Sequence, residues 1–543
     1  MNMLHPPETP ESEKTPLVTA LLEIIAQQQE QLASQQEQIF FLKEQVQSFK
    51  DEIARLKGHH PKPKVPPSAL EQDQGGKKWK KGSGKKRPGS KKRKKTARLE
   101  IHETKDIHPE RLPTGSLFKG YSEWTVQDLQ IQPHNTVYRL ARYRTPKGEY
   151  VTAKLPAEIN GEHFGVRLRC FILQQYYQAR ATEPAILEEL GDLGIDISSG
   201  QLNHIITEGK EDFHAEKDGV LRAGLEVSGH IHVDDTGARH KGKNGYCTHI
   251  GNELFAWFGS TPSKSRINFL TLLGAGRTCY AVNREALAYM KALRLPPIVC
   301  DRIGGLAGGS FENGAAWNDA VVEQDITSRL HVRIATEGAL IGGLLENGFN
   351  PDLAIVSDDA GQFRVFLHAL CWIHAERTIH KLVGFNDTQR ELLEEVRKRI
   401  WDFYRDLKNY KLAPTNKDKA RLSSRFDEIF TAKYGGFATL TRALKRLHKN
   451  RVELLLVLER PDVPLHNNLS ERDIREYVTK RKISGSTRSD SGRRCRDTFA
   501  SLKKTCRKLG LSFWTYLTDR ISGKGEIPRL SDVIRIKAQE SKA

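Results

Sequence analysis

Three groups of carboxylates in this sequence have the residue types and spacing of a phosphoryl-transfer site. Near the C-terminal end, the stretch PLHNNLSERDIR sets Glu471 beside two asparagines and two arginines, at the expected first turn of a helix. Two acidic pairs lie upstream, Asp234 with Asp235 and Asp358 with Asp359, and each pair follows an apolar run typical of a buried strand. Two carboxylates at strand ends and one on a late helix can bind a pair of Mg²⁺ ions, which activate a water or hydroxyl for in-line displacement.

The charge of the chain favours a polyanionic substrate. The 543 residues include 86 Lys and Arg against 67 Asp and Glu, which gives a net charge of +19. Such a balance attracts nucleic acid through counterion release, so a DNA backbone is the expected substrate.

Several other classes of protein are disfavoured. No stretch approaches the roughly 20 apolar residues that cross a bilayer, and residues 1–14 do not resemble a secretion signal, so we expect a cytoplasmic protein without a membrane partner. Seven cysteines are scattered without a CxxC pair, which indicates a reducing compartment and argues against a structural zinc site.

Residues 17–57 predict a coiled coil, after a short disordered segment at 1–16. The d positions fall at residues 21, 28, 35, 42, 49 and 56, and the a positions are Ile25, Leu32, Ile39, Val46 and Ile53. No Pro or Gly interrupts this repeat, so a homodimer or higher oligomer is expected, with a single amphipathic helix as the alternative.

A basic linker is predicted from residue 58 to residue 99. Between Lys77 and Arg98, thirteen of 22 residues are Lys or Arg, broken by Gly and Ser. This composition cannot form a core, so we expect a disordered tether that contacts phosphates without sequence preference.

A small α+β DNA-binding region is predicted before the catalytic core, and it has two parts. Alternation over Trp124–Ile131 and Thr136–Leu140 favours strands, and residues 100–165 read as a small β-rich module. Residues 166–224 are expected to be helical. There, Pro184–Leu193, a break at Gly194 and a Ser198 cap before Ser199–Ile206 resemble a helix-turn-helix, a pair that is also common as plain scaffold.

Residues 225–371 predict an α/β domain, the first part of a catalytic core. Strands are expected at His230–Val233, Tyr246–Phe258 and Ile267–Leu273, and a fourth at Leu353–Val356. The 274–345 insertion between the third and fourth strands contains a predicted helix at Asn283–Leu293, a Gly-rich loop at Gly304–Gly314 and a short helix at Glu337–Glu346.

Residues 372–463 predict a charged helical insertion into this core. The second part of the core, with the Glu471 helix, is then expected at 464–520, and a tail at 521–543. Three strands, a helix and a fourth strand that carries the second carboxylate follow the order of an RNase-H-like α/β core.

The motifs of the C-terminal half resemble the insertion-sequence-66 family of DDE transposases. The resemblance is most specific over residues 464–517, where Asn467-Asn468-x-x-Glu471-Arg472 is followed by Arg481-Lys482, Gly485-Ser486, Ser491-Gly492, Ser501-Leu502 and Trp514-x-Tyr516-Leu517. Cys371-Trp372-Ile373-His374-Ala375-Glu376-Arg377 is similar to the family's Cys-Trp-x-His-Ala-Arg-Arg signature, with Glu376 in place of an arginine. Val233-Asp234-Asp235-Thr236 stands where such transposases have Ala-Asp-Glu-Thr, and Ser357–Phe363 stands where they have Asp-Gly-Tyr-Ala-Gly-Tyr.

The resemblance implies an RNase-H-like core of the DDE and retroviral-integrase type, interrupted by an α-helical insertion and preceded by a coiled coil. It implies a bacterial, nucleoid-associated enzyme that cleaves and joins DNA at the ends of an insertion sequence. The catalytic and metal-binding residues would be Asp234, Asp358 and Glu471, holding two Mg²⁺ ions that Mn²⁺ can replace. The partners would be the element's terminal inverted repeats, target DNA and small accessory proteins encoded alongside.

Two departures mark this chain as a divergent member. The family usually carries a CxxC…CxxC zinc knuckle between linker and core, and these cysteines are missing here. The second departure is the 274–345 insertion before Asp358.

Several acidic and basic residues allow more than one interpretation. Strand alternation alone does not choose between Asp234 and Asp235, and the resemblance selects Asp234 and Asp358. Asp301, near a possible strand at Pro297–Cys300, is a competing carboxylate.

Basic side chains around Glu471 are predicted to clamp the DNA backbone, a solvated helix face being the alternative. They are His374, Arg377, Arg472, Arg475, Lys480, Arg481, Lys482 and Arg488. Cys371 and His374 form a lone Cys-x-x-His pair, which is weak evidence for a metal site. A core cysteine is favoured, with a histidine that either supports a metal ligand or contacts phosphate.

Two other functions fit the same sequence features. A non-catalytic DNA-binding or architectural protein, such as an inactive transposase remnant, needs only the coiled coil, the linker and the helix pair. A structure-specific nuclease of the same fold would cut DNA without joining it. Metal-dependent strand cleavage on duplex DNA carrying the element's ends separates these functions.

Deleting residues 1–57 should lower the mass of the protein in solution while its core stays folded, because the uninterrupted heptads predict self-association. Light scattering measures the mass and circular dichroism measures the fold. An unchanged mass would show that the helix packs within its own chain.

Overall fold

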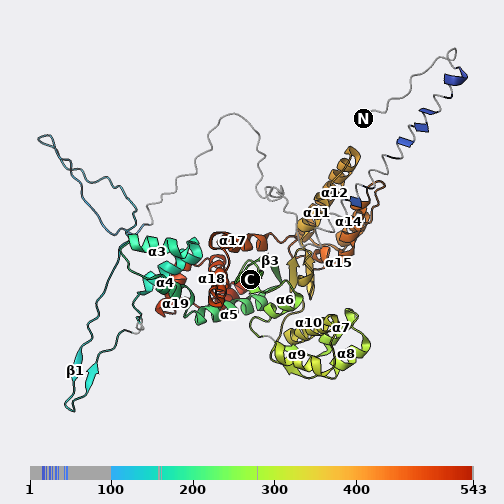
Figure 1. Ribbon diagram of the computed structural model, residues 1–543. Helices are drawn as coiled ribbons and strands as arrows, with labels where there is room; N and C mark the ends of the chain where they lie inside the picture. The colour runs from blue at the N-terminus through green and yellow to red at the C-terminus, as the bar shows by residue number, and fades with distance from the viewer. Residues whose placement is uncertain are drawn as a thin grey trace. The chain divides into compact units, whose positions relative to one another are not determined.

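The computed structural model (Figure 1) describes residues 99–156, 159, 162–277 and 279–540, with scattered positions between 15 and 46. The contacts divide the chain into residues 51–135 and a larger unit made of the rest. The sheet, the helices around it and the site all belong to the larger unit.

The predicted coiled coil falls mostly outside the described residues, as do the basic linker up to residue 98 and residues 1–14. The described positions from 16 to 46 are helical. Four of the predicted a and d residues, Ile25, Leu32, Leu42 and Val46, are 41–57% exposed. The coiled coil stays a prediction.

A five-stranded mixed sheet forms the centre of the α/β part, in the order β5-β4-β3-β8-β9. Its strands are β3 (His230–Gly237), β4 (Tyr246–Gly251), β5 (Ala256–Thr261), β8 (Ala354–Ser357) and β9 (Leu367–Leu370). The first three pair antiparallel, and β8 joins β3 in parallel and is itself parallel to β9. The chain is thus mixed α/β, as predicted.

Two of the predicted strands differ from the structure: the second is two strands, and the third is a helix. The second is a hairpin of β4 and β5, because the Asn252 side chain accepts from the Leu254 N–H and closes a turn. The third, Ile267–Leu273, is helix α6 (Arg266–Leu273), which Ser265 caps by accepting from the Asn268 N–H. A short apolar run fits a buried helix and a buried strand equally well, so periodicity alone could not separate them.

The free edge of β5 is covered by helix α18 (Asp490–Lys508). The N–H groups of Ala256, Phe258 and Ser260 donate to side chains of α18, those of Thr505, Ser501 and Asp497 in that order. An uncovered edge strand would present unpaired backbone groups. This packing instead joins the C-terminal helices to the sheet.

The insertion between α6 and β8 is a helical lobe (Figure 1). Its elements are β6 (Tyr280–Ala281), α7 (Arg284–Ala292), α8 (Pro297–Gly304), β7 (Ser310–Phe311), α9 (Gly314–Glu323) and α10 (Arg329–Glu346). The helices predicted at 283–293 and 337–346 are confirmed, the second as part of the longer α10. The possible strand at 297–300 was wrong, since Pro297 begins α8, where a missing N–H is tolerated.

A second helical block separates β9 from the helix that carries Glu471, as the sequence predicted. It contains α11 (Trp372–His380), α12 (Asp387–Leu412), α13 (Asn416–Phe430), α14 (Ala438–Lys449), α15 (Arg451–Leu454) and α16 (Leu456–Glu459). Trp372 is buried among Phe403, Phe426 and Phe430. These aromatic contacts join α11, which follows directly after β9, to α12 and α13.

The remaining helices precede and follow the sheet in sequence. They are α2 (Val166–Leu173), the π-helix η4 (Gln174–Ala179), α3 (Glu183–Asp192), α4 (Ser199–Thr207), α5 (Glu211–Val227), α17 (Asn468–Ser484), α19 (Phe513–Ser522) and α20 (Leu530–Glu540). The predicted helix pair is present as α3 and α4, and Ser198 caps α4 as expected. No described helix is long and apolar enough to span a membrane.

Residues 99–141 contain no strand, although alternation predicted two. The one hairpin nearby joins β1 (Arg142–Arg144) to β2 (Tyr150–Thr152), and all six residues are exposed. Trp124 is 90% exposed, so the apolar face that the alternation implies has nothing packed on it within the described residues. Alternation stabilises a strand only where partners cover that face.

Close packing of α10 against β6 depends on a glycine. A Cβ at Gly343 would lie 1.9 Å from the backbone oxygen of Cys279. Gly343→Ala should therefore destabilise the lobe by about 3 kcal/mol or more, since backbone cannot move aside cheaply. Gly304→Ala is the control, because a Cβ there meets nothing within 4 Å. Thermal unfolding of both variants tests this, and equal melting temperatures would contradict the close packing.

Candidate functional site

The parallel pairing of β3 with β8 brings two acidic side chains together. His230, Ile231 and His232 lie opposite Ala354, Ile355 and Val356. Asp234 lies two residues after His232, still in β3. Asp358 lies two residues after Val356, directly after the end of β8. Side chains alternate along a strand, so Asp234 lies on the His232 face and Asp358 on the Val356 face, which is the same face of the sheet.

The pKa of Asp234 is raised by burial and in part by the nearby carboxylate of Asp358. Burial, and then the charge of Asp358, raise the pKa of Asp234 to about 7. The Asp234 carboxylate accepts from the Asp235 N–H (2.8 Å), and that of Asp358 accepts from the Ala360 N–H (3.1 Å). Among the described residues, neither forms an ion pair. Two neighbouring carboxylates without an ion-pair partner fit a site for a divalent metal.

The other member of each acidic pair is already neutralised. Asp235 forms an ion pair with Lys264 and accepts from Gln362 Nε2 (2.6 Å). Asp359 forms ion pairs with Arg364 and with a second arginine, Arg446. Both carboxylates therefore have structural partners. Asp301, the third competing carboxylate, is exposed on α8 and lies outside the sheet.

Glu471 lies in the first turn of α17, where two side chains of α11 reach it. Its Oε1 is 3.3 Å from Arg377 Nη1 and 3.5 Å from His374 Nε2. Burial lowers the pKa of His374, but Cys371, Glu471 and Asp358 raise it to about 9 overall. The charge of His374 also lowers the pKa of Asp234. One cationic ring therefore interacts electrostatically with all three carboxylates, those of Asp234, Asp358 and Glu471.

Asn467 fixes the start of α17 against β3. Asparagine is a common helix cap, yet the Asn467 side chain makes no cap hydrogen bond. It donates instead from Nδ2 to the Val233 carbonyl (2.8 Å), and its Oδ1 lies 3.0 Å from His232 Nδ1. Its own N–H donates to Cys371 Sγ (3.2 Å). Asn467 is one helical turn from Glu471, so it positions the carboxylate next to the strand that carries Asp234.

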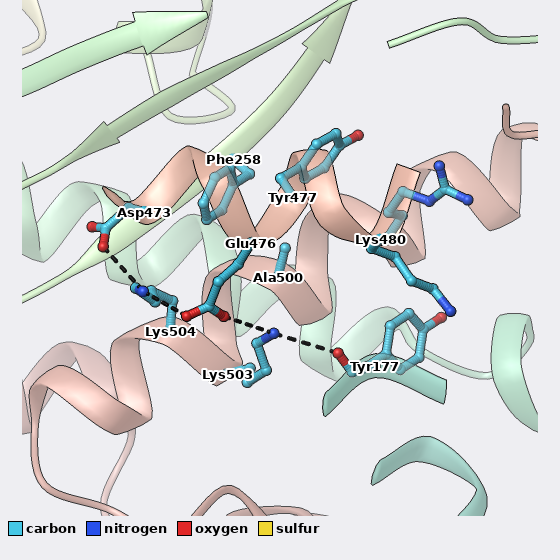
Figure 2. Close-up of a pocket in the computed structure, with 10 residues that line it drawn as sticks. Tyr177, Phe258, Asp473, Glu476, Tyr477, Lys480, Ala500, Lys503 and Lys504 are labelled. Carbon is cyan, nitrogen blue, oxygen red and sulfur yellow. Dashed lines mark hydrogen bonds and ion pairs between the residues drawn. The ribbon is translucent and has the colours of Figure 1, made fainter. Parts of the chain in front are cut away.

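Ion pairs with α18 hold the next turns of α17 (Figure 2). Lys504 lies between Asp473 (3.2 Å) and Glu476 (2.8 Å), and Lys503 lies 3.1 Å from Glu476. Burial raises the pKa of Glu476, but these lysines outweigh it and hold the value at about 2. A buried pair of this kind is costly to break, since removal of one partner leaves an uncompensated charge.

The predicted basic stripe divides into exposed and buried members. Arg472, Arg475, Lys482 and Arg488 are exposed, and Arg481 is half-buried with its guanidinium 3.2 Å from Thr236 Oγ1.

Lys480 does not belong to the exposed stripe. It is buried, donates to the Ala181 carbonyl (3.0 Å) and lies 3.6 Å from the centre of the Tyr176 ring. Burial and nearby Arg496 lower the pKa of Lys480 to about 7. Helical spacing explains the difference, because position 480 faces α18 and η4 rather than solvent.

Comparison with known proteins identifies the chain. The family described as "Transposase IS66 family" matches residues 357–494, a range that contains Asp358 and Glu471. A protein of Sinorhizobium fredii (strain NBRC 101917 / NGR234), called "Uncharacterized protein y4jO", is 44% identical over 322 residues, which is 59% of this chain and 100% of the relative. The chain belongs to the IS66 transposase family. For this IS66 protein, the family implies a transposase-type enzyme whose partner is DNA.

The raised pKa of Asp234 predicts a link between pH, metal and stability in the IS66 protein. In the folded chain Asp234 keeps its proton up to about pH 7, whereas an unfolded Asp loses it near pH 4. Folding stability without metal should therefore fall as the pH rises between these values. Mg²⁺ should raise the melting temperature more at about pH 8 than at about pH 6.

Thermal melts with and without Mg²⁺ test this link. Asp234→Asn should raise the metal-free melting temperature at the higher pH and remove most of the Mg²⁺ effect. The control Asp301→Asn makes the same charge change at an exposed site and should leave the Mg²⁺ effect intact. An undiminished Mg²⁺ effect in Asp234→Asn would contradict a metal site at this carboxylate.

Proposed function

We propose that this protein is a DDE transposase that cleaves DNA strands at the ends of an insertion sequence and joins them to target DNA. Asp234, Asp358 and Glu471 would hold two Mg²⁺ ions, or Mn²⁺ in their place. The parallel register of β3 and β8 carries the proposal, because continuing it by two residues pairs Asp234 with Asp358. An RNase-H-like core is part of it, supported by three antiparallel strands followed by two parallel ones in the order β5-β4-β3-β8-β9.

The donor set suits the proposed metal. Three carboxylates offer hard oxygen ligands, which Mg²⁺ prefers, and the repulsion between Asp234 and Asp358 falls when a cation binds. When bound, the metal supplies Lewis-acid activation of a water or 3′ hydroxyl and stabilises the leaving oxygen at the scissile phosphate.

The chain's own side chains would orient the carboxylates and the DNA. Arg377 and His374 hold Glu471 in place through its Oε1. As cations beside the carboxylates, both are also suited to hold a phosphate of the DNA strand. Exposed Arg472 and Arg475, on the same helix as Glu471, would bind the backbone on either side of that phosphate.

Removing one carboxylate ligand should abolish cleavage and leave DNA binding nearly unchanged. Asp234→Asn, Asp358→Asn and Glu471→Gln keep side-chain shape but remove a charged ligand. Affinity for duplex should stay within about 3-fold, because Lys and Arg contacts to phosphates dominate binding. Cleavage of linear duplex carrying the element's ends, measured in Mg²⁺ under single-turnover conditions, should fall to background.

Asp301→Asn is the matched control and should cleave at the normal rate. Loss of cleavage with Asp235→Asn, but not with Asp234→Asn, would overturn the choice within that pair. A wild-type protein that binds the ends without cutting them is a DNA-binding remnant, and one that cuts but never joins is a nuclease.

A further inference from the structure

A second group of potential metal ligands lies on β3 before the carboxylate pair. His230 and His232 are two residues apart on this strand and so share a face, and Glu253 lies in the turn between β4 and β5. One ligand atom from each of the three residues falls within 4.8 Å of the others. None of the three has a part in the proposed transposition chemistry.

Hydrogen bonding determines which nitrogen of His232 is free. Asn467 donates from Nδ2 to the Val233 carbonyl, so its Oδ1 is the atom that faces His232 Nδ1. An amide oxygen only accepts, so His232 Nδ1 must carry the hydrogen and Nε2 must carry a lone pair. A histidine that is held in this way through its other nitrogen is typical of a metal ligand.

His230 contributes a nitrogen without a hydrogen-bond partner. Its Nε2 is buried and forms no hydrogen bond to any described residue. Glu253 Oε2 lies 3.6 Å away, beyond hydrogen-bonding distance. Nitrogen and oxygen ligands about 2.0–2.1 Å from a tetrahedral Zn²⁺ lie about 3.3–3.4 Å apart, so a small rotation of the exposed glutamate would reach that spacing.

We propose that His230, His232 and Glu253 bind one first-row divalent ion, with Zn²⁺ the expected occupant and water as a fourth ligand. Two imidazole nitrogens and one carboxylate suit Zn²⁺ and not Mg²⁺, which prefers oxygen ligands alone. The ligands include no cysteine, so the lack of CxxC pairs in the sequence has no bearing on this site. The alternative is a plain ion pair between a protonated His230 and Glu253.

The ion would act as a clamp rather than in catalysis. It would tie the turn between β4 and β5 to β3 and hold the ring of His232 still. His232 contacts Asn467, which fixes the start of the helix that carries Glu471. Zn²⁺ would therefore stabilise the position of α17. The proposal does not depend on the transposase activity.

The test measures Zn²⁺ binding to the full-length protein, by equilibrium dialysis and elemental analysis in excess Mg²⁺. The background carries Asp234→Asn and Asp358→Asn, which removes the carboxylate pair as a second site. One Zn²⁺ per chain should bind. His230→Gln and Glu253→Gln should each weaken binding by about 10-fold or more, since each removes one of three protein ligands. His204→Gln, an exposed histidine on α4, is the control and should bind normally.

Co²⁺ provides a second measurement on the same variants. Bound Co²⁺ should give visible absorption bands of a four-coordinate site, and Zn²⁺ should displace it. Glu253 is exposed, so Glu253→Gln should melt at the same temperature as its parent without metal, which separates lost binding from misfolding. Absence of a Zn²⁺ that survives excess Mg²⁺, or equal binding by parent and Glu253→Gln, would overturn the proposal in favour of the ion pair.

Discussion

Asp234 and Asp358 are held close together by two adjacent parallel strands, β3 and β8, in a place where burial disfavours the charge of Asp234. The neighbouring charge adds to the cost, and together the two effects raise the pKa of Asp234 to about 7. A protein keeps such an arrangement only where the surrounding structure fixes it, and perturbed carboxylates of this kind concentrate at functional sites. Much of the surrounding structure holds β3, β8 and the helix that carries Glu471 in place.

The helix that carries Glu471 is held at several points by different interactions. Asn467 bonds to β3 at its start, and Arg481 reaches Thr236 of the same strand near its end. Between these two points, ion pairs of Asp473 and Glu476 with α18 fix the side that faces away from solvent. Because α18 also covers the edge of β5, it joins the helix of Glu471 to the sheet a second time. The site is thus built from segments up to about 240 residues apart in the chain, which only tertiary packing brings together.

Part of this arrangement could be predicted from the sequence. The strands before Asp234 and Asp358, the helix of Glu471 and the helical block before it were predicted from apolar runs and charge patterns, and the structure has them. The family signature over residues 464–517 was equally visible, since its motifs are local in sequence. The prediction of a strand at Ile267–Leu273 was wrong, because an eight-residue apolar helix such as α6 and a buried strand have the same composition.

Other features depended on contacts that no local pattern contains. Asn467 has the residue type of a helix cap, and only the fold gives it the partners His232 and Val233. Lys480 looked like part of a DNA-binding stripe, and only the packing of α17 on α18 and η4 shows that it is buried. The choice of Asp234 over Asp235 came from the resemblance. The structure adds a physical argument for it, since Lys264 already neutralises Asp235.

The most direct test of the central claim is to map where a divalent metal sits, by metal-directed cleavage of the polypeptide. Fe²⁺ replaces Mg²⁺, ascorbate and peroxide generate hydroxyl radicals at the ion, and mass spectrometry locates the backbone cuts. The protein should carry His230→Gln, so that the second proposed site does not contribute. The account predicts cuts next to Asp234, Asp358 and Glu471, on three different elements, all suppressed by excess Mg²⁺. Cuts confined to Asp359 or Asp301, or cuts near Asp234 with none at Asp358 and Glu471, would contradict a shared metal site.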